Sequence, residues 1–288
     1  MEKGIEITIV IGTLNRPNVV MSLIQQLEEE SKKIQLEVIV VDQSILENYN
    51  DLAKKFPKQI NFKLTHFDKP NTCKYLNYGW IEAQAPIVLF LDDDVTLTES
   101  AIKAHIEAYK DSSVNGVAGR VINDEEKISQ DFNVGSIKWF GAMMSMNFSF
   151  DKQVNVSFPY GCNMSFRKSA LQKIDGFDEK LLSPGFAYME VDMGYRLNKK
   201  WPKSFIFNPD ALVYHHKHKT GGTRNNYSSN EVFHSNQFNY GYFLGKNFSW
   251  IENIICFIRR LPYQIIKEPR AIPDILQGFI HGKKQGKK

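Results

Sequence analysis

The sequence predicts an α/β fold with a mostly parallel central sheet flanked by helices. Four short segments rich in β-branched residues are typical of buried strands, namely residues 6–11, 36–42, 60–66 and 86–91. Segments of helical periodicity separate them, and this alternation favours a parallel sheet covered on both faces. Polar residues follow three of these strands, and ligands bind beyond the carboxyl ends of strands in such sheets.

The helices are predicted from spacing and end signals. Between the first two strands, apolar residues recur at helical spacing after Pro17, and Lys32 and Lys33 close the segment. Residues 73–84 and 98–110 also have helical patterns. Farther along, a helix is expected from about Ser169 and another over 189–200, followed by a late strand at 211–214.

Two stretches of the second half are less regular. Residues 135–150 are aromatic and Met-rich, which fits a short strand pair, a pocket-lining loop or ordinary core. In the segment MEVDMGYRL, a helix places Asp192 and Arg196 on one face, where they could pair. Glu190 lies about 200° away from Asp192 around that helix.

Composition excludes several protein classes. The chain has 288 residues, 42% hydrophobic and 24% charged, as expected for an ordinary folded protein. Cys73, Cys162 and Cys256 show neither zinc-ligand spacing nor a disulfide framework, which favours a reducing compartment. We find no signal-peptide pattern and no apolar window of membrane-spanning length. A cytoplasmic protein is therefore expected, with a peripheral position on the inner face of the membrane as an option.

That option comes from the C-terminal segment, residues 246–288. Nine Lys or Arg and three acidic residues give it a charge of +6, whereas the rest of the chain is −2. Trp250, Ile254, Phe257 and Ile258 fall near one helical face. The pattern fits a helix in the headgroup region of an anionic membrane, or a helix packed on the rest of the chain. No nucleic-acid recognition motif is visible.

The stretch PIVLFLDDDVTLT places Asp92, Asp93 and Asp94 side by side at the end of a predicted strand. Like charges in contact repel, so the cluster costs stability unless a positive partner lies between the carboxylates. A solvated lysine or a divalent cation would satisfy it.

Six motifs in order over about residues 5–220 resemble the family 2 glycosyltransferases, which invert configuration and have the GT-A fold. They are ITIVIGTLNRP, VIVVDQS, LNYGW, FLDDDV, GCNMSFRKSALQKIDGFDE and MEVDMGYRL. The resemblance implies a catalytic domain over 1–245, with a nucleotide-binding half of about 1–120 and an acceptor half of about 121–245. A basic amphipathic extension, 246–288, follows it.

The resemblance implies a divalent cation, Mn²⁺ or Mg²⁺, that neutralises the diphosphate of a nucleotide-sugar donor. Asp94 would be the principal ligand, and Asp92 would face the ribose or share the metal. Asp93 is grouped with the nucleotide-binding residues, although an outward or structural role is expected for it. Of the two adjacent histidines, His216 is preferred for the metal and His215 for the diphosphate. Oxygen-rich ligation argues against zinc.

Further roles are implied by position in the motifs. Asp42 would accept a hydrogen bond from the pyrimidine ring, the alternative being a turn residue. Lys74 stands near the place of a frequent family arginine, which Leu76 occupies here. The remaining expected residues are Thr13, Asn15, Arg16 and Asn77 around the nucleotide; Gly161, Cys162, Asn163 and Trp139 on the sugar and acceptor side; and Arg224, which with His215 would clamp the diphosphate.

Inversion requires a carboxylate that takes the proton of the attacking hydroxyl. The family helix usually begins Glu-Asp, one residue, Asp; anchored on Asp192 and Arg196, this chain has Met189 and Glu190 instead. Glu190 is therefore the predicted base. Action by Asp192 and loss of activity are the alternatives.

The sequence thus predicts a metal-dependent inverting glycosyltransferase. It would move a hexosyl, rhamnosyl or N-acetylhexosaminyl group from a UDP- or dTDP-linked donor to a hydroxyl of a saccharide or lipid-linked glycan, as in polysaccharide biosynthesis. A catalytically silent relative that binds nucleotide or sugar is a second hypothesis. A nucleotidyltransferase is a third, but IGTLNRPN lacks the Gly-rich, basic phosphate loop that it needs.

Overall fold

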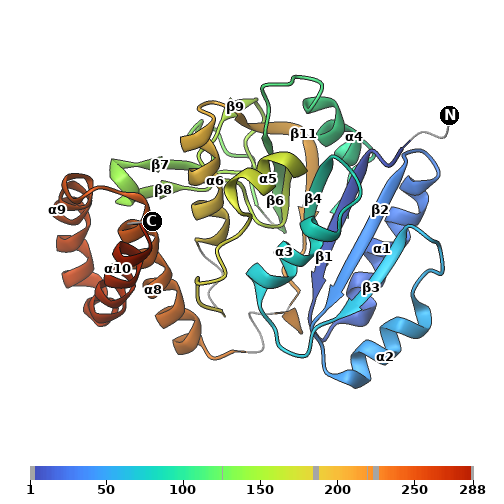
Figure 1. Cartoon of the computed structure of the whole chain (residues 1–288), viewed down its shortest axis with the longest axis horizontal. Helices are drawn as coiled ribbons and strands as arrows, with labels where there is room; N and C mark the ends of the chain where they lie inside the picture. Colours follow the sequence, from blue (N-terminus) through green and yellow to red (C-terminus); the bar gives the residue numbers. More distant parts are fainter. Residues whose placement is uncertain (1–3, 125, 184–187, 219, 223–226, 287–288) are drawn as a thin grey trace.

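A central sheet with helices on both faces organises the chain. The computed structural model describes residues 4–124, 126–183, 188–218, 220–222 and 227–286. Among them, nine strands form one sheet in the order β3-β2-β1-β4-β10-β6-β11-β5, with β9 paired to β11 (Figure 1). Its strands are β1 Ile7–Thr13, β2 Leu36–Asp42, β3 Phe62–His66, β4 Ile87–Asp92, β5 Val95–Leu97, β6 Gly116–Asn123, β9 Val154–Asn155, β10 Asn163–Arg167 and β11 Phe205–His215.

The first half of the sheet confirms the predicted alternation. Strands β1 to β4 are mutually parallel neighbours, and β1 and β2 are almost wholly buried. The register places Thr13 opposite Asp42 and Gly12 opposite Asp92. The carboxyl ends of β1, β2 and β4 therefore meet at one edge of the sheet, where the polar residues were expected to collect.

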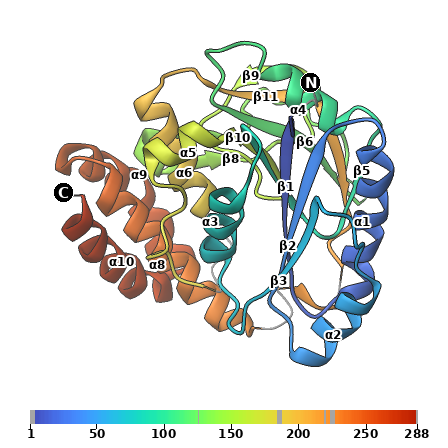
Figure 2. The ribbon, with the colours of Figure 1, turned by 45° about the vertical axis from the view of Figure 1, so that its right-hand side comes forward.

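The helices of this half lie on both faces. In Figure 2, α1 lies on one side of the sheet and α3 on the other. Residues Val20, Leu23, Ile24 and Leu27 form the buried stripe of α1, as their spacing predicts. The helices of the first half are α1 Pro17–Ser31, α2 Leu46–Lys55, α3 Thr72–Glu82 and α4 Ala101–Ala108; α5 Lys168–Ile174 and α6 Met189–Lys200 follow in the second half.

The second half departs from the parallel pattern. Strand β10 runs antiparallel to β4 and β6, whereas β11 is parallel to β6. The Met-rich stretch contains a small hairpin, β7 Ser136–Lys138 and β8 Met143–Ser145, joined by the 3₁₀ turn η1 Trp139–Gly141. This hairpin packs against α9 and supplies none of the described pocket-lining residues.

The C-terminal segment folds into helices α8 Ser229–Asn247, α9 Trp250–Lys267 and α10 Ile272–Gln285, with the 3₁₀ turn η2 Pro269–Ala271 between the last two. The boundary expected at 245/246 falls inside α8. Helices α8 and α10 run parallel with their backbones in contact, since a Cβ on Gly241 would lie 2.0 Å from the Ile275 carbonyl oxygen. No helix among the described residues is both long and apolar enough to span a bilayer.

Candidate active site

A pocket of about 330 Å³ opens at the carboxyl ends of β1 and β4. Loops from both halves of the chain and the first turn of α6 contribute to it. Its lining includes Gly12, Thr13, Leu14, Arg16, Gln43, Thr72, Tyr75, Asp92, Asp93, Asp94, Tyr160, Gly161, Cys162, Met189, Glu190, His215, Lys217, His218, Gly221 and Gly222.

Arg16 provides a positive partner for the aspartate cluster. Its Nε donates to Asp93 Oδ2 at 2.8 Å, its second terminal nitrogen also pairs with Asp93, and its Nη1 donates to Asp94 Oδ2 at 3.1 Å. Thr13 Oγ1 donates to Asp93 at 2.6 Å. Burial raises the pKa of Asp93 to about 7, although Arg16 opposes the shift. Asp93 is therefore a structural carboxylate, but it points inward and not outward.

Asp92, Asp94 and His215 leave a place for a further cation. His215 Nε2 lies 3.3 Å from Asp94 Oδ1 and 3.6 Å from Asp92 Oδ2. The other ring nitrogen, Nδ1, lies 3.0 Å from Asn123 Oδ1. When Nδ1 carries the proton and donates to Asn123, the lone pair of Nε2 faces two carboxylates. That arrangement is stable only with a proton or a metal ion between them.

The donor set fits a divalent metal. Ligand atoms of Asp92, Cys162 and His215 all lie within 4.8 Å of one another. Burial alone would raise the pKa of Asp94, but His215 and Arg16 outweigh it and hold that pKa below its usual range. Asp94 is therefore a carboxylate at neutral pH. Two carboxylates and an imidazole suit Mn²⁺ or Mg²⁺, and the Cys162 thiol is a softer donor beside them.

Glu190 faces the same pocket from the first turn of α6. Its side chain is buried, and Oε2 has no hydrogen-bond partner among the described residues. Burial, with a smaller contribution from the charge of Asp92, raises its pKa to about 7. A Cβ on Gly161 would lie 3.8 Å from Glu190 Oε1, so the absence of a side chain there leaves room beside the carboxylate. Glu190 is thus a bare carboxylate that can take up a proton near neutral pH.

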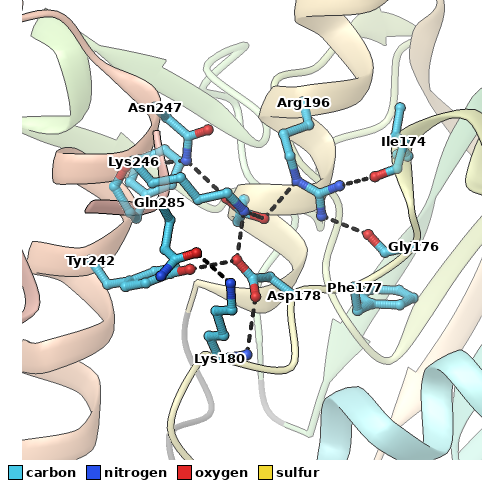
Figure 3. Close-up of polar contacts among 12 residues, drawn as sticks. Ile174, Gly176, Phe177, Asp178, Lys180, Arg196, Tyr242, Lys246, Asn247 and Gln285 are labelled. Atoms are coloured by element: carbon cyan, nitrogen blue, oxygen red, sulfur yellow. Dashed lines mark hydrogen bonds and ion pairs between the residues drawn. The ribbon is translucent and has the colours of Figure 1, made fainter. Parts of the chain in front are cut away.

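Asp192, two residues later, is fully occupied. It accepts from Arg196 Nε at 2.7 Å, from Lys246 Nζ at 3.0 Å and from Asn247 Nδ2 at 2.8 Å. Lys246 also donates to Asp178 at 2.7 Å. Figure 3 shows Lys246 and Asn247 extending from α8 toward Arg196 of α6. Asp192 does not line the pocket. Its hydrogen bonds to Lys246 and Asn247 connect α6 to α8 instead.

The backbone just before Glu190 has an unusual conformation. Tyr188 precedes α6 with φ of +80°, a left-handed value that bulky residues rarely adopt. Its ring packs against Tyr240 and Phe243 of α8, with centroids 5.4 and 6.0 Å away. Such a conformation persists where surrounding contacts impose it. Helix α8 therefore fixes the point at which the chain turns into α6 and presents Glu190.

The pocket brings together nine of the residues expected from sequence. They are Thr13, Arg16, Asp92, Asp93, Asp94, Gly161, Cys162, Glu190 and His215. Asp42 lies at the same sheet edge, where its Oδ1 accepts from the Ser44 amide at 2.6 Å and its buried Oδ2 has no hydrogen-bond partner among the described residues. It does not line the pocket itself.

Three expected asparagines have structural contacts instead. Asn15 Oδ1 accepts from the Ile45 amide and from Asn48, which joins the loop after β1 to the start of α2. Asn77 exchanges hydrogen bonds with the backbone of Phe177. Asn163 is buried and donates to the Ala211 carbonyl. These three asparagines therefore hold segments of the chain together and do not line the pocket.

The remaining expectations differ in outcome. His216 points away from the pocket, where its ring nitrogens meet Thr96 and Asp124, so the structure puts His215 and not His216 beside the aspartates. Trp139 is also distant from the lining and stacks under the Arg259 guanidinium at 3.6 Å. Lys74 is exposed on α3. Arg224 lies outside the described residues.

Sequence reasoning missed several lining residues. Tyr160 meets the His215 ring edge-on, with centroids 6.0 Å apart, and helps to orient that imidazole. The His218 amide donates to Asp94 Oδ2 at 3.2 Å. Tyr75 lies against Gly12, where a Cβ would come within 2.4 Å of its ring. Tyr160 directly precedes the motif that begins at Gly161, and His218 lies four residues after the strand predicted at 211–214, but only the path of the chain shows that they face the aspartates.

Known proteins resemble this chain in sequence and in fold. The family model "Glycosyl transferase family 2" matches residues 8–175. The Probable glycosyltransferase YdaM of Bacillus subtilis (strain 168) is 26% identical over 199 residues, which cover 65% of this chain and 45% of that protein. The chain therefore spans less than half the length of this relative.

Solved structures share the architecture. S. aureus TarS 1-349 in complex with UDP-GlcNAc superposes with a TM-score of 0.65 at 14% identity, covering 96% of this chain and 82% of TarS 1-349. GalNAc-T7 with UDP, GalNAc and Mn²⁺ gives a TM-score of 0.70 at 12% identity, covering 99% and 57%. The fold is therefore of the GT-A type. Because the family model covers more than half of the sequence, this chain belongs to glycosyl transferase family 2.

Proposed function

We propose that this protein is a metal-dependent inverting glycosyltransferase. The observation that carries the proposal is the buried Oε2 of Glu190, which has no hydrogen-bond partner among the described residues and faces the pocket that also holds Asp92, Asp94 and His215. One wall therefore offers a base and another offers ligands for a cation. A transfer from an anionic donor to a neutral hydroxyl needs both of these.

The donor would be a nucleotide sugar. Its base would lie toward the ends of β1 and β2. There Asp42 Oδ2, which has no partner in the part of the chain that the structure describes, can accept from a ring N–H, as UDP and dTDP carriers offer. Asp92, Asp94 and His215 would hold Mn²⁺ or Mg²⁺. When bound, the ion neutralises charge on the leaving diphosphate. Lys217 also lines the pocket and adds positive charge near that group.

The acceptor would be a hydroxyl of a saccharide or a lipid-linked glycan. Glu190 would remove its proton as the oxygen attacks the anomeric carbon from the face opposite the diphosphate, which inverts the configuration. Gly161 leaves open the space in front of this carboxylate. Asp192 is already bound by two cations and an amide, so it holds α6 in place and does not accept the proton.

The direct test is a panel of nucleotide sugars incubated with saccharide acceptors, with Mn²⁺ or with EDTA. Release of nucleoside diphosphate is measured together with the NMR coupling of the new anomeric proton. We expect acceptor-dependent release with one donor, lost in EDTA, and a product of inverted configuration. A retained configuration, or turnover that persists in EDTA, would contradict the proposal.

A further inference from the structure

Helix α9 leaves much of its apolar surface exposed, although Cys256 and Phe257 pack inward. Its buried positions include Asn253, Cys256 and Gln264, two of which are amides. Its outer face carries five exposed isoleucines, between 52% and 74% accessible, which we call the isoleucine stripe: Ile251, Ile254, Ile258, Ile265 and Ile266. A surface helix ordinarily buries its apolar face and exposes its polar one. Here a continuous apolar surface is left toward solvent.

Packing fixes this orientation, so the helix is not free to roll. Asn253 Nδ2 donates to the Phe248 carbonyl at 3.0 Å. The Arg260 guanidinium lies over the Tyr240 ring of α8 at 4.3 Å, and Arg259 stacks on Trp139 of η1 at 3.6 Å. Contacts on the inner and lateral faces therefore hold the stripe outward. Ile251 and Ile266 are 15 residues apart, so the stripe is about 22 Å long.

Aromatic and apolar side chains widen the stripe on both edges. Trp250 and Tyr263 are exposed, one near each end of α9. Trp250 contacts Phe279 of α10, with centroids 5.7 Å apart. The exposed Leu276 and Ile280 are one helical turn apart and adjoin Phe279 on the surface of α10. The patch thus spans α9 and the neighbouring side of α10, larger than scattered surface residues.

Exposed basic side chains on the same helices point to the partner of the patch. The sequence of residues 246–288 has a net charge of +6, and although Lys246 is paired with Asp178 and Asp192, Lys267, Arg270 and Lys284 are exposed. A second copy docked on this face would bring two such basic segments together, which is unfavourable. An anionic lipid surface instead complements both features, since apolar side chains enter the acyl boundary while Lys and Arg meet the headgroups.

We propose that the isoleucine stripe lies in the headgroup and acyl boundary of an anionic bilayer and holds the protein at its surface. Trp250 and Tyr263 would lie at the interface, where amphipathic rings are favoured. The inference does not depend on the proposed reaction, because it needs neither donor nor acceptor.

Vesicle flotation tests it with the whole protein. Wild type is expected to float with vesicles of phosphatidylcholine and phosphatidylglycerol and to bind pure phosphatidylcholine at least tenfold more weakly. Ile258→Glu and Ile266→Glu should each lower binding about tenfold or more, because each replaces an isoleucine that would enter the bilayer with a charge. Ile60→Glu is the matched control: Ile60 is 92% exposed on another part of the surface, before β3, and its substitution should leave binding unchanged.

A site-specific probe gives a second readout. The three native cysteines are buried, so an environment-sensitive fluorophore can be placed on Ile258→Cys, with Ile60→Cys as the control. Emission from position 258 alone should shift to the blue on anionic vesicles. Absence of flotation by wild type would overturn the proposal. So would equal flotation by the Ile258→Glu variant, or a dimer in light scattering that Ile258→Glu dissociates.

Discussion

Two carboxylates on the first turn of α6 have opposite surroundings. Glu190 faces the pocket with an oxygen that has no partner among the described residues, and burial raises its pKa. Asp192 accepts from Arg196, Lys246 and Asn247 on the side facing α8. A carboxylate held by two cations is a poor base, but it can hold two helices together. The bare carboxylate costs stability, and it remains available for a proton.

The comparison also links the C-terminal helices to the pocket. Lys246 and Asn247 come from the segment expected to be an appended tail, yet they hold the helix that presents Glu190. Tyr188, just before α6, packs on the same helix α8. The C-terminal helices are therefore part of the architecture of the site.

The largest effect is expected for Glu190→Gln. If Glu190 is the base, acceptor-dependent turnover should fall by about 10²- to 10⁴-fold, because glutamine cannot take the proton. Binding of donor nucleotide should persist. The measurement is the rate of diphosphate release with a saturating donor. Turnover within threefold of wild type would assign the base elsewhere.

Asp192→Asn should act chiefly on stability. It leaves the half-buried Arg196 and Lys246 beside a neutral group at a fully buried position, and breaking an ion pair with a buried carboxylate costs about 3 to 5 kcal/mol. Denaturant unfolding followed by circular dichroism measures the loss. If the variant is as stable as wild type but inactive, Asp192 is the catalytic carboxylate and the comparison is reversed.

Lys246→Met should have a smaller effect of the same kind. Asp192 keeps Arg196 and Asn247, so a loss of about 1 to 2 kcal/mol in the free energy of unfolding is expected. Lys284→Met, at an exposed position on α10, is the matched control and should change stability by less than about 0.5 kcal/mol. Equal effects of the two substitutions would remove Lys246 from the network.

The pH dependence sharpens the contrast further. Because the pKa of Glu190 is raised from 4.5 to about 7, the folded state binds the extra proton between these values, and its contribution to stability is lost as pH rises through them. Glu190→Gln should therefore match wild type in stability near pH 4 and exceed it by roughly 1 to 3 kcal/mol at pH 8. Thermal melts across this range measure the difference, and a constant difference would contradict the raised pKa.

Much of this arrangement was predictable from the sequence. Strand and helix periodicity gave β1 to β4 and α1, and parallel strands then placed Thr13, Asp42 and Asp92 at one edge. Helical geometry alone separated Glu190 from Asp192 by about 200°. These features depend on local repeats, which the sequence carries directly.

Other features depended on contacts between distant segments. Whether His215 or His216 faces the pocket follows from the phase of β11, where Val213 and His215 are buried and Tyr214 is exposed. Alternating burial is expected along any strand, but the sequence alone did not show how far this strand extends, and so which of the two histidines faces inward. Trp139 does not line the pocket and stacks with Arg259, which lies 120 residues away in the sequence, so this contact could not be predicted locally. The outward orientation of the apolar face of α9 depends on contacts of Arg260 with α8 and of Arg259 with η1.

The most direct test of the account is calorimetric titration of UDP, dTDP and GDP, with and without Mn²⁺, into wild type, His215→Ala and His216→Ala. The two variants remove adjacent imidazoles, of which only His215 lies beside Asp92 and Asp94. We predict Mn²⁺-dependent binding of one nucleotide, weakened at least tenfold by His215→Ala and unchanged by His216→Ala. Nucleotide binding with the same affinity in the presence and absence of Mn²⁺ would contradict a metal-dependent donor site in this pocket. So would an equal loss of affinity in His216→Ala and His215→Ala.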